Sequence, residues 1–219
     1  FDATLTAKDT FDGGDGVDTV KINGGNLTQT SVVGGLSNVE ILELSTAHTI
    51  SLESNISPTT FDFGTNETNQ VLNLLDGYTA ATTVKLGSDA TNEDKIVNTA
   101  NVDLTITANS TSYDETTSVT GGTGTDSISI LNTAAGQVDL TATTGVDSIT
   151  FTDYTAGVDV ELDTHSYTLD SVAFAKVLTI DASSMDSGEV FTLTGDATVT
   201  KMDVTAGGGD DLLVLGTLA

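Results

Sequence analysis

Three short stretches of the chain combine glycine and aspartate at a fixed spacing. Residues 13–18 read Gly-Gly-Asp-Gly-Val-Asp, and residues 121–126 read Gly-Gly-Thr-Gly-Thr-Asp. Residues 206–211 repeat the pattern with alanine in the first place. A large aliphatic residue stands two places after each aspartate. The shared pattern is therefore G-G-x-G-x-D-x-U-x, in which U is that aliphatic residue.

This pattern suits a hard cation such as calcium. Glycine adopts positive φ at little steric cost, so a glycine-rich loop can present several carbonyl oxygens to one point. The aspartate in the sixth place adds a carboxylate, and calcium binds about six to eight such oxygen ligands. The aliphatic residue in the eighth place then points into a core. The alternative interpretation of each stretch is a simple turn with a solvated aspartate.

The predicted metal ligands come from these copies and from two partial ones. Asp9 occupies the sixth place of a degenerate copy that precedes residue 13, and Asp147 belongs to a half copy at 145–149. Asp12 and Asp15 either ligate the ion or only strengthen the negative field around it. The full set of candidate metal ligands is Asp9, Asp12, Gly13, Gly14, Asp15, Gly16, Asp18, Gly121, Gly122, Gly124, Asp126, Asp147, Gly207, Gly209 and Asp211.

The composition favours cations as partners. The chain has 219 residues, with 32 acidic residues, six lysines and no arginine, and its formal net charge is −26. Nucleic acids and anionic membranes bind basic patches, so this charge predicts neither as a partner. No apolar run approaches the roughly 20 residues that cross a bilayer, which predicts no membrane insertion. Without cysteine, stiffness must come from packing, metal or assembly.

Short strands separated by turn residues dominate the rest of the sequence. Residues 39–44 (Val-Glu-Ile-Leu-Glu-Leu) and 102–107 (Val-Asp-Leu-Thr-Ile-Thr) place apolar groups on one face and polar groups mainly on the other, as half-buried strands do. Similar runs recur along the chain, with Gly, Asn, Asp and Ser between them. We therefore expect an all-β chain, either a sandwich or a solenoid. Residues 1–219 are treated as one domain, with a soft seam at 108–117, where polar residues interrupt the apolar rhythm.

The glycine–aspartate pattern is similar to the calcium-binding repeats of RTX proteins, which Gram-negative bacteria export. The copies in this chain are scattered rather than in tandem. Phrases such as Leu36–Leu44 and Leu178–Met185 resemble those of calcium-dependent surface-layer (S-layer) proteins of the Caulobacter type. The resemblance implies a parallel β-solenoid, similar to a β-roll, with calcium bound in its turns.

The same resemblance implies a function and a location. We expect an acidic structural protein, an S-layer or extracellular matrix subunit that folds and self-assembles on binding Ca²⁺. Its partners would be copies of itself in a lattice or filament, with cell-surface polysaccharide as a further candidate. Type I secretion would deliver it to the outside of a Gram-negative cell, as part of a longer exported chain.

An enzyme is the less favoured hypothesis. Sites that stabilise developing negative charge usually need a positive group, and the six lysines form no cluster in the sequence. No nucleophile elbow, phosphate loop or Ser-His-Asp pattern is present. His48 and His165 lack the spacing of a zinc site. We therefore predict a non-catalytic protein. The alternative is an adhesin, or the RTX repeat domain of a larger secreted polysaccharide-acting enzyme.

Overall fold

The protein is an all-β parallel solenoid. The computed structural model describes residues 10–23, 35–64, 69–87, 93–100, 102–109, 111–113, 116–131, 137–140, 142–152, 165–169, 173–174, 178–183, 191–195, 198–199, 202–208 and 210–215. Within these residues all the regular elements are strands, and every strand pair is parallel. This confirms the solenoid and excludes the sandwich. Asp9 and Gly209, two of the predicted ligands, lie outside the described residues.

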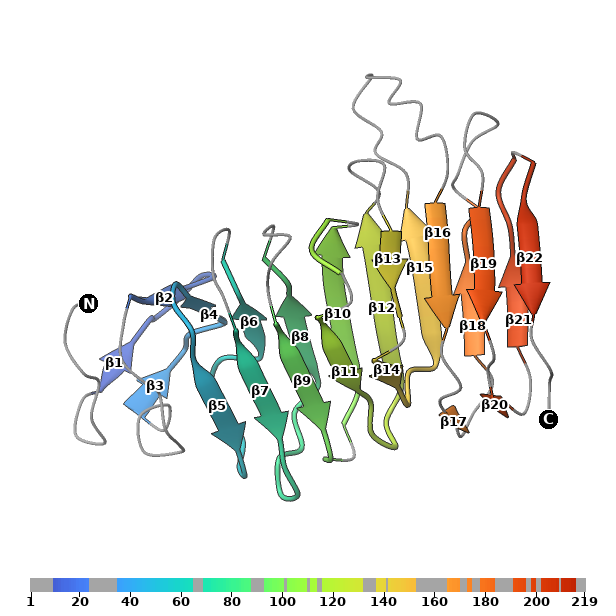
Figure 1. Cartoon of the computed structure of the whole chain (residues 1–219). Coiled ribbons are helices and arrows are strands. Elements are labelled where there is room, and N and C mark those ends of the chain that lie inside the picture. Colours follow the sequence, from blue (N-terminus) through green and yellow to red (C-terminus); the bar gives the residue numbers. More distant parts are fainter. Residues whose placement is uncertain are drawn as a thin grey trace.

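One long sheet forms the back wall of the solenoid. It has nine strands in chain order, which Figure 1 shows side by side from the N-terminal to the C-terminal end. They are β2 (Thr19–Ile22), β4 (Ile41–Leu44), β6 (Thr60–Asp62), β8 (Thr82–Lys85), β10 (Leu104–Asn109), β12 (Asp126–Leu131), β15 (Ser148–Thr152), β18 (Leu178–Asp181) and β21 (Met202–Thr205). We call it the main sheet.

Shorter sheets face the main sheet. The first has five strands: β5 (Thr49–Leu52), β7 (Val71–Leu74), β9 (Lys95–Asn98), β11 (Ser118–Thr120) and β14 (Thr143–Thr144). The second has four: β13 (Gln137–Asp139), β16 (His165–Leu169), β19 (Phe191–Gly195) and β22 (Leu212–Leu215). Two strand pairs complete the coils, β1 (Phe11–Asp12) with β3 (Leu36–Ser37), and β17 (Ala173–Phe174) with β20 (Thr198–Val199).

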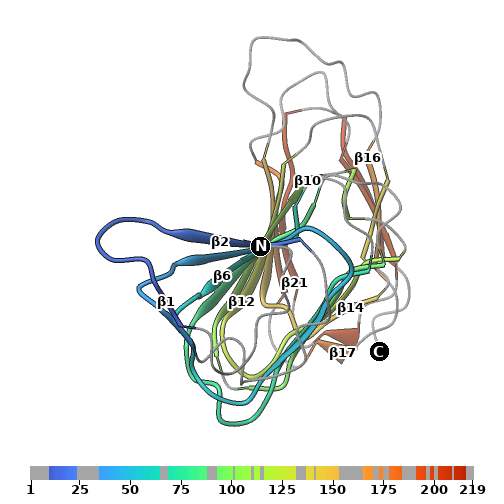
Figure 2. The same ribbon diagram turned by 90° about the vertical axis from the view of Figure 1, so that its left-hand side faces the viewer.

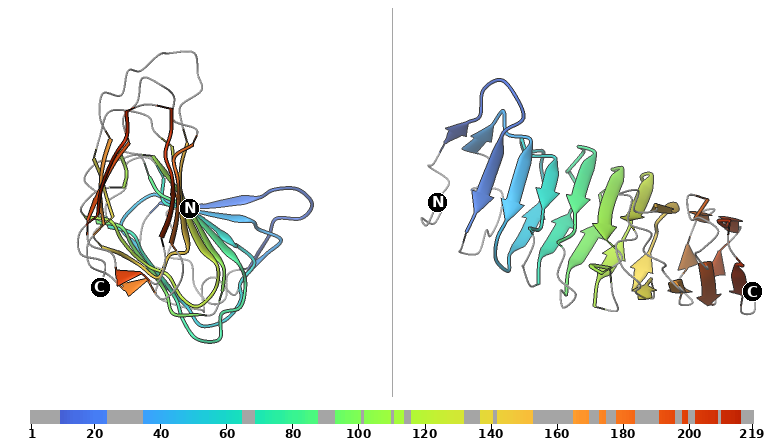
Figure 3. Two further views of the ribbon diagram at one scale, coloured as in Figure 1. Left: turned by 90° about the vertical axis from the view of Figure 1, so that its right-hand side faces the viewer. Right: turned by 90° about the horizontal axis from the view of Figure 1, so that it is seen from above.

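The chain returns to the main sheet once per coil. Residues that are hydrogen-bonded across neighbouring coils are 21 positions apart for Asp126 and Asp147, 22 for Lys21 and Glu43, and 24 for Gln70 and Asp94. Seen along the stack, the cyan and green coils overlap closely, the first coil, in blue, swings away from them, and the orange and red C-terminal strands are displaced from them (Figures 2 and 3). The coil is therefore much longer than the nine-residue repeat that the glycine–aspartate pattern suggests.

Aligned apolar columns fill the interior. Alternation along each strand buries every second residue, as in β4, where Leu42 and Leu44 are buried and Ile41 and Glu43 are partly exposed. The parallel register then stacks equivalent residues of successive coils. One such column is Val20, Leu42, Phe61, Val84, Ile106, Ile128, Ile149, Ile180 and Val204.

The region around the proposed seam is continuous with its neighbours. β10, which ends at Asn109, pairs with β8 on one side and β12 on the other. Tyr113 is fully buried, and its hydroxyl is hydrogen-bonded to that of Thr143. Residues 108–109, 111–113 and 116–117 therefore belong to the stack of coils.

A buried polar column supports the facing sheet. The residues that precede β5, β7 and β9 are His48, Gln70 and Asp94, and all three are almost completely buried. The backbone N–H of His48 donates to Gln70 Oε1 (3.1 Å), and that of Gln70 donates to Asp94 Oδ1 (3.0 Å). The side chains of Gln70 and Asp94 therefore each satisfy a buried N–H of the preceding coil, as a buried backbone donor requires.

Candidate metal centre

The connections that lead into the main sheet carry carboxylates from coil to coil. The first and second copies of the glycine–aspartate pattern lie in these connections, between β1 and β2 and between β11 and β12. We call this border of the solenoid the acidic edge, and define it by Asp15, Asp18, Glu40, Glu53, Asp76, Asp103, Asp126 and Asp147. Carboxylates aligned in this way attract cations.

In the first copy the glycines shape an exposed loop. Gly14 has a φ of 87° and Gly16 a φ of 128°, conformations that residues with a side chain rarely adopt. Gly13 begins the loop in a tighter place, where its N–H donates to the Ser37 carbonyl of the next coil (3.0 Å). A Cβ on Gly13 would overlap the Asn38 carbonyl oxygen.

Asp18 closes this loop and joins it to the next coil. Its N–H donates to Glu40 Oε2 (2.8 Å), and its carbonyl accepts from the N–H groups of Glu40 and Ile41 (both 3.1 Å). Its carboxylate lies against Gly13, and Oδ2 is buried without a hydrogen-bond donor. A buried carboxylate oxygen that lacks a donor is the arrangement that a bound cation would satisfy. The residues of the first copy therefore fit calcium.

The other predicted ligands of the first copy lie at its rim. Asp12 Oδ1 accepts hydrogen bonds from the Gly14 N–H (3.2 Å) and from Asn38 Nδ2 (2.7 Å). Asp15 is exposed at the tip of the loop. Asn38 itself has a φ of 51°, a left-handed conformation that asparagine tolerates better than most residues.

In the second copy the glycines make room for neighbouring coils. A Cβ on Gly121 would overlap the Gly145 carbonyl oxygen, one on Gly122 would lie 2.5 Å from the Ala100 oxygen, and one on Gly124 would overlap the Val102 oxygen. The glycines of the two copies therefore have different roles. In the first copy, Gly14 and Gly16 adopt backbone conformations with positive φ, and in the second copy the glycines allow neighbouring coils to approach closely.

Asp126 is fully buried and accepts hydrogen bonds on both oxygens. Oδ1 accepts from Asn98 Nδ2 (3.0 Å) and from the Leu104 N–H (3.1 Å), both on the preceding coil. Oδ2 accepts from the Gly122 N–H (2.9 Å). Burial raises the pKa of the Asp126 carboxyl above its ordinary value of 3.8, and the hydrogen bonds from Asn98 and the backbone only partly oppose this. The donor set of the second copy fits a carboxylate held by N–H groups, and it does not fit calcium.

Asp147 stands beside Asp126 on the next coil. Its Oδ2 accepts from the Asp126 N–H (2.9 Å), and its own N–H donates to the Asp126 carbonyl (2.8 Å). Glu40 makes the equivalent contacts with Asp18. The sequence pattern thus brings Asp126 and Asp147 together, and the partner of Asp18 on the next coil is Glu40.

The third copy occupies a different border. Residues 206–211 connect β21 of the main sheet to β22 of a facing sheet, so this loop leaves the main sheet. Asp211 is exposed and Gly207 is partly exposed. The third copy therefore lies apart from the acidic edge.

Sequence reasoning missed Asn38, Glu40 and Asn98. A signal for the first two exists, because each complete copy is followed on the next coil by a left-handed residue, a buried valine and an acid. The two instances are Asn38-Val39-Glu40 and Gly145-Val146-Asp147, with φ values of 51° and 68° at the first residue. A search for this second phrase about one coil after the glycines finds both.

In the described residues, the first copy included, no group of three or more histidine or acidic side chains converges on one point. Calcium in the first copy would therefore need backbone carbonyl oxygens and water in addition to carboxylate.

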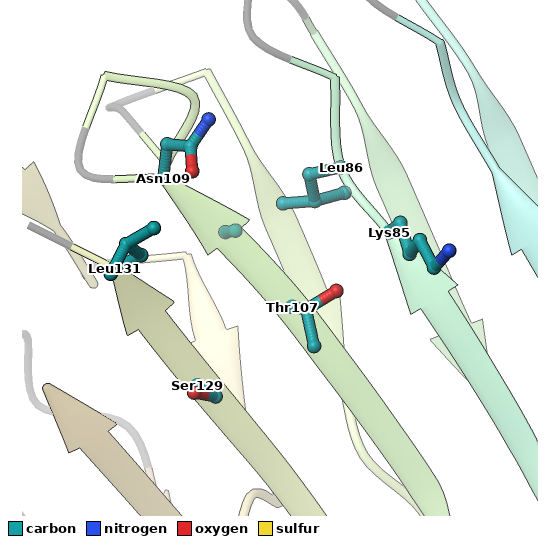
Figure 4. Close-up of a pocket in the computed structure, with 7 residues that line it drawn as sticks. Lys85, Leu86, Thr107, Asn109, Ser129 and Leu131 are labelled. Carbon is teal, nitrogen blue, oxygen red and sulfur yellow. The ribbon is translucent and has the colours of Figure 1, made fainter. Parts of the chain in front are cut away.

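A shallow groove lies on the outer side of the main sheet, at the ends of β8, β10 and β12 (Figure 4). Its volume is about 200 Å³. Lys85, Thr107, Asn109 and Ser129 contribute an amine, two hydroxyls and an amide, and Leu86 and Leu131 contribute apolar surface. Groups of this kind can hydrogen-bond a ligand rich in hydroxyls.

Comparison with known proteins finds no matching family model, no matching curated protein and no matching solved structure. A search of the described part of the chain for a helix able to span a bilayer finds none.

The contact at Gly124 predicts a specific loss of stability. Because the Val102 oxygen belongs to the backbone of the neighbouring coil, Gly124→Ala should lower the free energy of unfolding by about 1–3 kcal/mol. Thr125→Ala, at the exposed neighbouring position, should change it by less than about 0.5 kcal/mol, because alanine keeps the backbone N–H that donates to Asp103. Urea unfolding measures both, and equal effects would contradict the close approach of these coils.

The raised pKa of Asp126 predicts a pH dependence. Between 3.8 and the raised pKa, the folded state binds this proton and the unfolded state does not. The stability that Asp126 contributes is therefore present in acid and is lost as the pH rises through the raised pKa. The free energy of unfolding of the wild type, minus that of Asp126→Asn, should fall with pH and then level off. Urea unfolding from about pH 4 to pH 7 measures it, and a rising difference would contradict the assignment.

Proposed function

We propose that this protein is a calcium-binding structural solenoid of the bacterial cell exterior, and that calcium bound at the first glycine–aspartate loop stabilises its fold. The observation that carries the proposal is the buried Oδ2 of Asp18, which has no hydrogen-bond donor in a loop built by Gly14 and Gly16. The acidic edge supplies a negative field around that loop.

The charge of the chain explains how calcium would act. With a net charge of −26 the compact state repels itself, and bound cations reduce that repulsion. Calcium that binds only the folded state adds RT ln(1 + [Ca]/Kd) to its stability. A chain of this kind stays loose where calcium is scarce, and folds where calcium is abundant, as it is outside the cell.

The proposed role is structural and not catalytic. The resemblance of residues 13–21 and 121–129 to RTX repeats supports export by type I secretion from a Gram-negative bacterium. The resemblance of residues 36–44 to S-layer phrases supports assembly with copies of the same chain at the cell surface. A long stack of coils with regular faces suits such an assembly.

A second candidate function rests on the groove at the ends of β8, β10 and β12. Among the described outward-facing residues of β10 and β12, Thr105, Thr107, Ser127 and Ser129 are all uncharged. The charged group in the lining, Lys85, lies 3.8 Å from Asp62 Oδ2, which offsets its charge. A largely uncharged, hydroxyl-bearing surface in a strongly acidic protein favours a neutral saccharide as ligand, which is the chemistry of an adhesin that binds surface polysaccharide.

Calcium titration of the chelated protein tests the first proposal. Calcium at about 100 times its Kd should add about 2.7 kcal/mol to the free energy of unfolding, and should increase light scattering as copies assemble. Asp18→Asn should lose most of the stabilisation. Asp76→Asn, which removes the same charge from an exposed turn of the acidic edge, should keep it. An equal response of the two variants would reject the site.

A glycan array tests the second candidate. Neutral oligosaccharides should bind the wild type, and Asn109→Ala should weaken binding about five- to tenfold because it removes one hydrogen-bonding group. Thr49→Ala, at an exposed position on the facing sheet, should bind as the wild type does. Binding that is unaffected by Asn109→Ala would rule out the groove.

A further inference from the structure

The two complete copies of the glycine–aspartate pattern differ in the hydrogen-bond donors that surround the aspartate carboxylate. Asp18 has a buried oxygen without a donor, whereas Asp126 accepts hydrogen bonds on both oxygens. We infer that the second copy closes without a cation, because the preceding coil supplies N–H groups where calcium would bind, and that calcium binding belongs to the first copy. The second half of this inference rests on the proposed function.

The donors around Asp126 are held in place. The N–H groups of Leu104 and Gly122 belong to the backbone of two adjacent coils, so they cannot rotate away from the carboxylate. Their positive ends point at the oxygens, where an approaching cation would meet them. Because Asp126 is completely buried, water does not come between its carboxylate oxygens and these N–H groups.

Asn98 is the side chain that determines whether the Asp126 carboxylate is held by hydrogen bonds or is open to calcium. It is 1% exposed, and its Nδ2 lies 3.0 Å from both Asp126 Oδ1 and the Val102 carbonyl oxygen, while its own Oδ1 is buried without a hydrogen-bond donor. A carboxylate and a carbonyl that converge on one point are oxygen ligands for calcium. In this protein the Asn98 amide occupies that point and supplies the positive hydrogens. The polypeptide itself therefore takes the place of the ion.

The glycines of the second copy agree with this assignment. Gly122 and Gly124 lie directly against the carbonyl oxygens of Asn98, Ala100 and Val102, so the two coils are already in contact. In the first copy, Gly14 and Gly16 face open space or only the Asp18 side chain. The first loop thus has room for an ion and its water, and the second is filled by the preceding coil.

Replacement of Asn98 provides the decisive experiment. Asn98→Asp removes the amide hydrogens and places a second carboxylate beside Asp126. In chelator this variant should unfold at a lower temperature than the wild type, and calcium should restore the loss. It should also bind one more calcium ion per chain than the wild type in equilibrium dialysis. Asn73→Asp, which makes the same charge change at a partly exposed position of β7, should gain neither property.

Asp126→Asn gives the complementary measurement. It should lower the unfolding temperature equally with calcium and with chelator, and should leave the number of bound ions unchanged. A lost ion in Asp126→Asn would overturn the inference and leave the proposed function intact. A wild type that binds no calcium would instead reject the proposed function. The inference about the second copy is then tested by Asn98→Asp alone. A calcium-dependent rise in the unfolding temperature of this variant supports the inference, and no rise overturns it. This readout also decides if Asp126→Asn fails to fold.

Discussion

One interaction recurs at the corners of the solenoid and holds its coils in register. The backbone N–H that enters a strand is satisfied by an oxygen of the side chain at the same place on the next coil. Asp18 and Glu40 form such a pair, as do Asp126 and Asp147, and Gln70 and Asp94 form one on the facing sheet. Because these corners are partly or wholly buried, their donors cannot rely on water. An acid or amide at each corner is therefore a structural requirement before it is a metal ligand.

This requirement changes the meaning of the acidic composition. Aspartates that look like cation ligands in the sequence serve first as acceptors for the backbone. Asp126 accepts three N–H groups, and Asp103 Oδ1 accepts the Thr125 N–H (2.7 Å). Only where a corner leaves an oxygen without a donor, as at Asp18, does the same residue type remain available for an ion.

The sequence predicted the main sheet well because its strands alternate. Val39–Leu44 and Val102–Thr107 carry enough apolar residues to be recognised, and they overlap β4 and β10. Most strands of the five-stranded facing sheet were missed, whereas β7, β13, β19 and β22 overlap apolar runs of the sequence. β11 contains Val119 as its only large apolar residue, and the described part of β14 is two threonines, so neither shows a periodic pattern. Their strand conformation comes from pairing with neighbouring coils.

The candidate site was predicted in part. The pattern located Asp18 and the loop around it, which are local in sequence. Glu40 and Asn98 were missed because each contacts its aspartate from another coil, 22 and 28 residues away. The pattern also suggested equal sites at Asp18 and Asp126. Their difference depends on the preceding coil, which lies outside the nine residues of the motif.

The parallel stack has a consequence for how events travel along the molecule. Within the main sheet, every strand is hydrogen-bonded only to the strands next to it in the stack. An influence at one corner can reach a distant one only by passing through each coil between them, so the protein behaves as a one-dimensional chain of nearest neighbours. An ion at the first loop would act most strongly on the coil that holds Glu40, and its effect would fade along the stack. The corner at Asp126, which is closed by hydrogen bonds from the chain itself, would then stabilise the middle of the molecule independently of that ion.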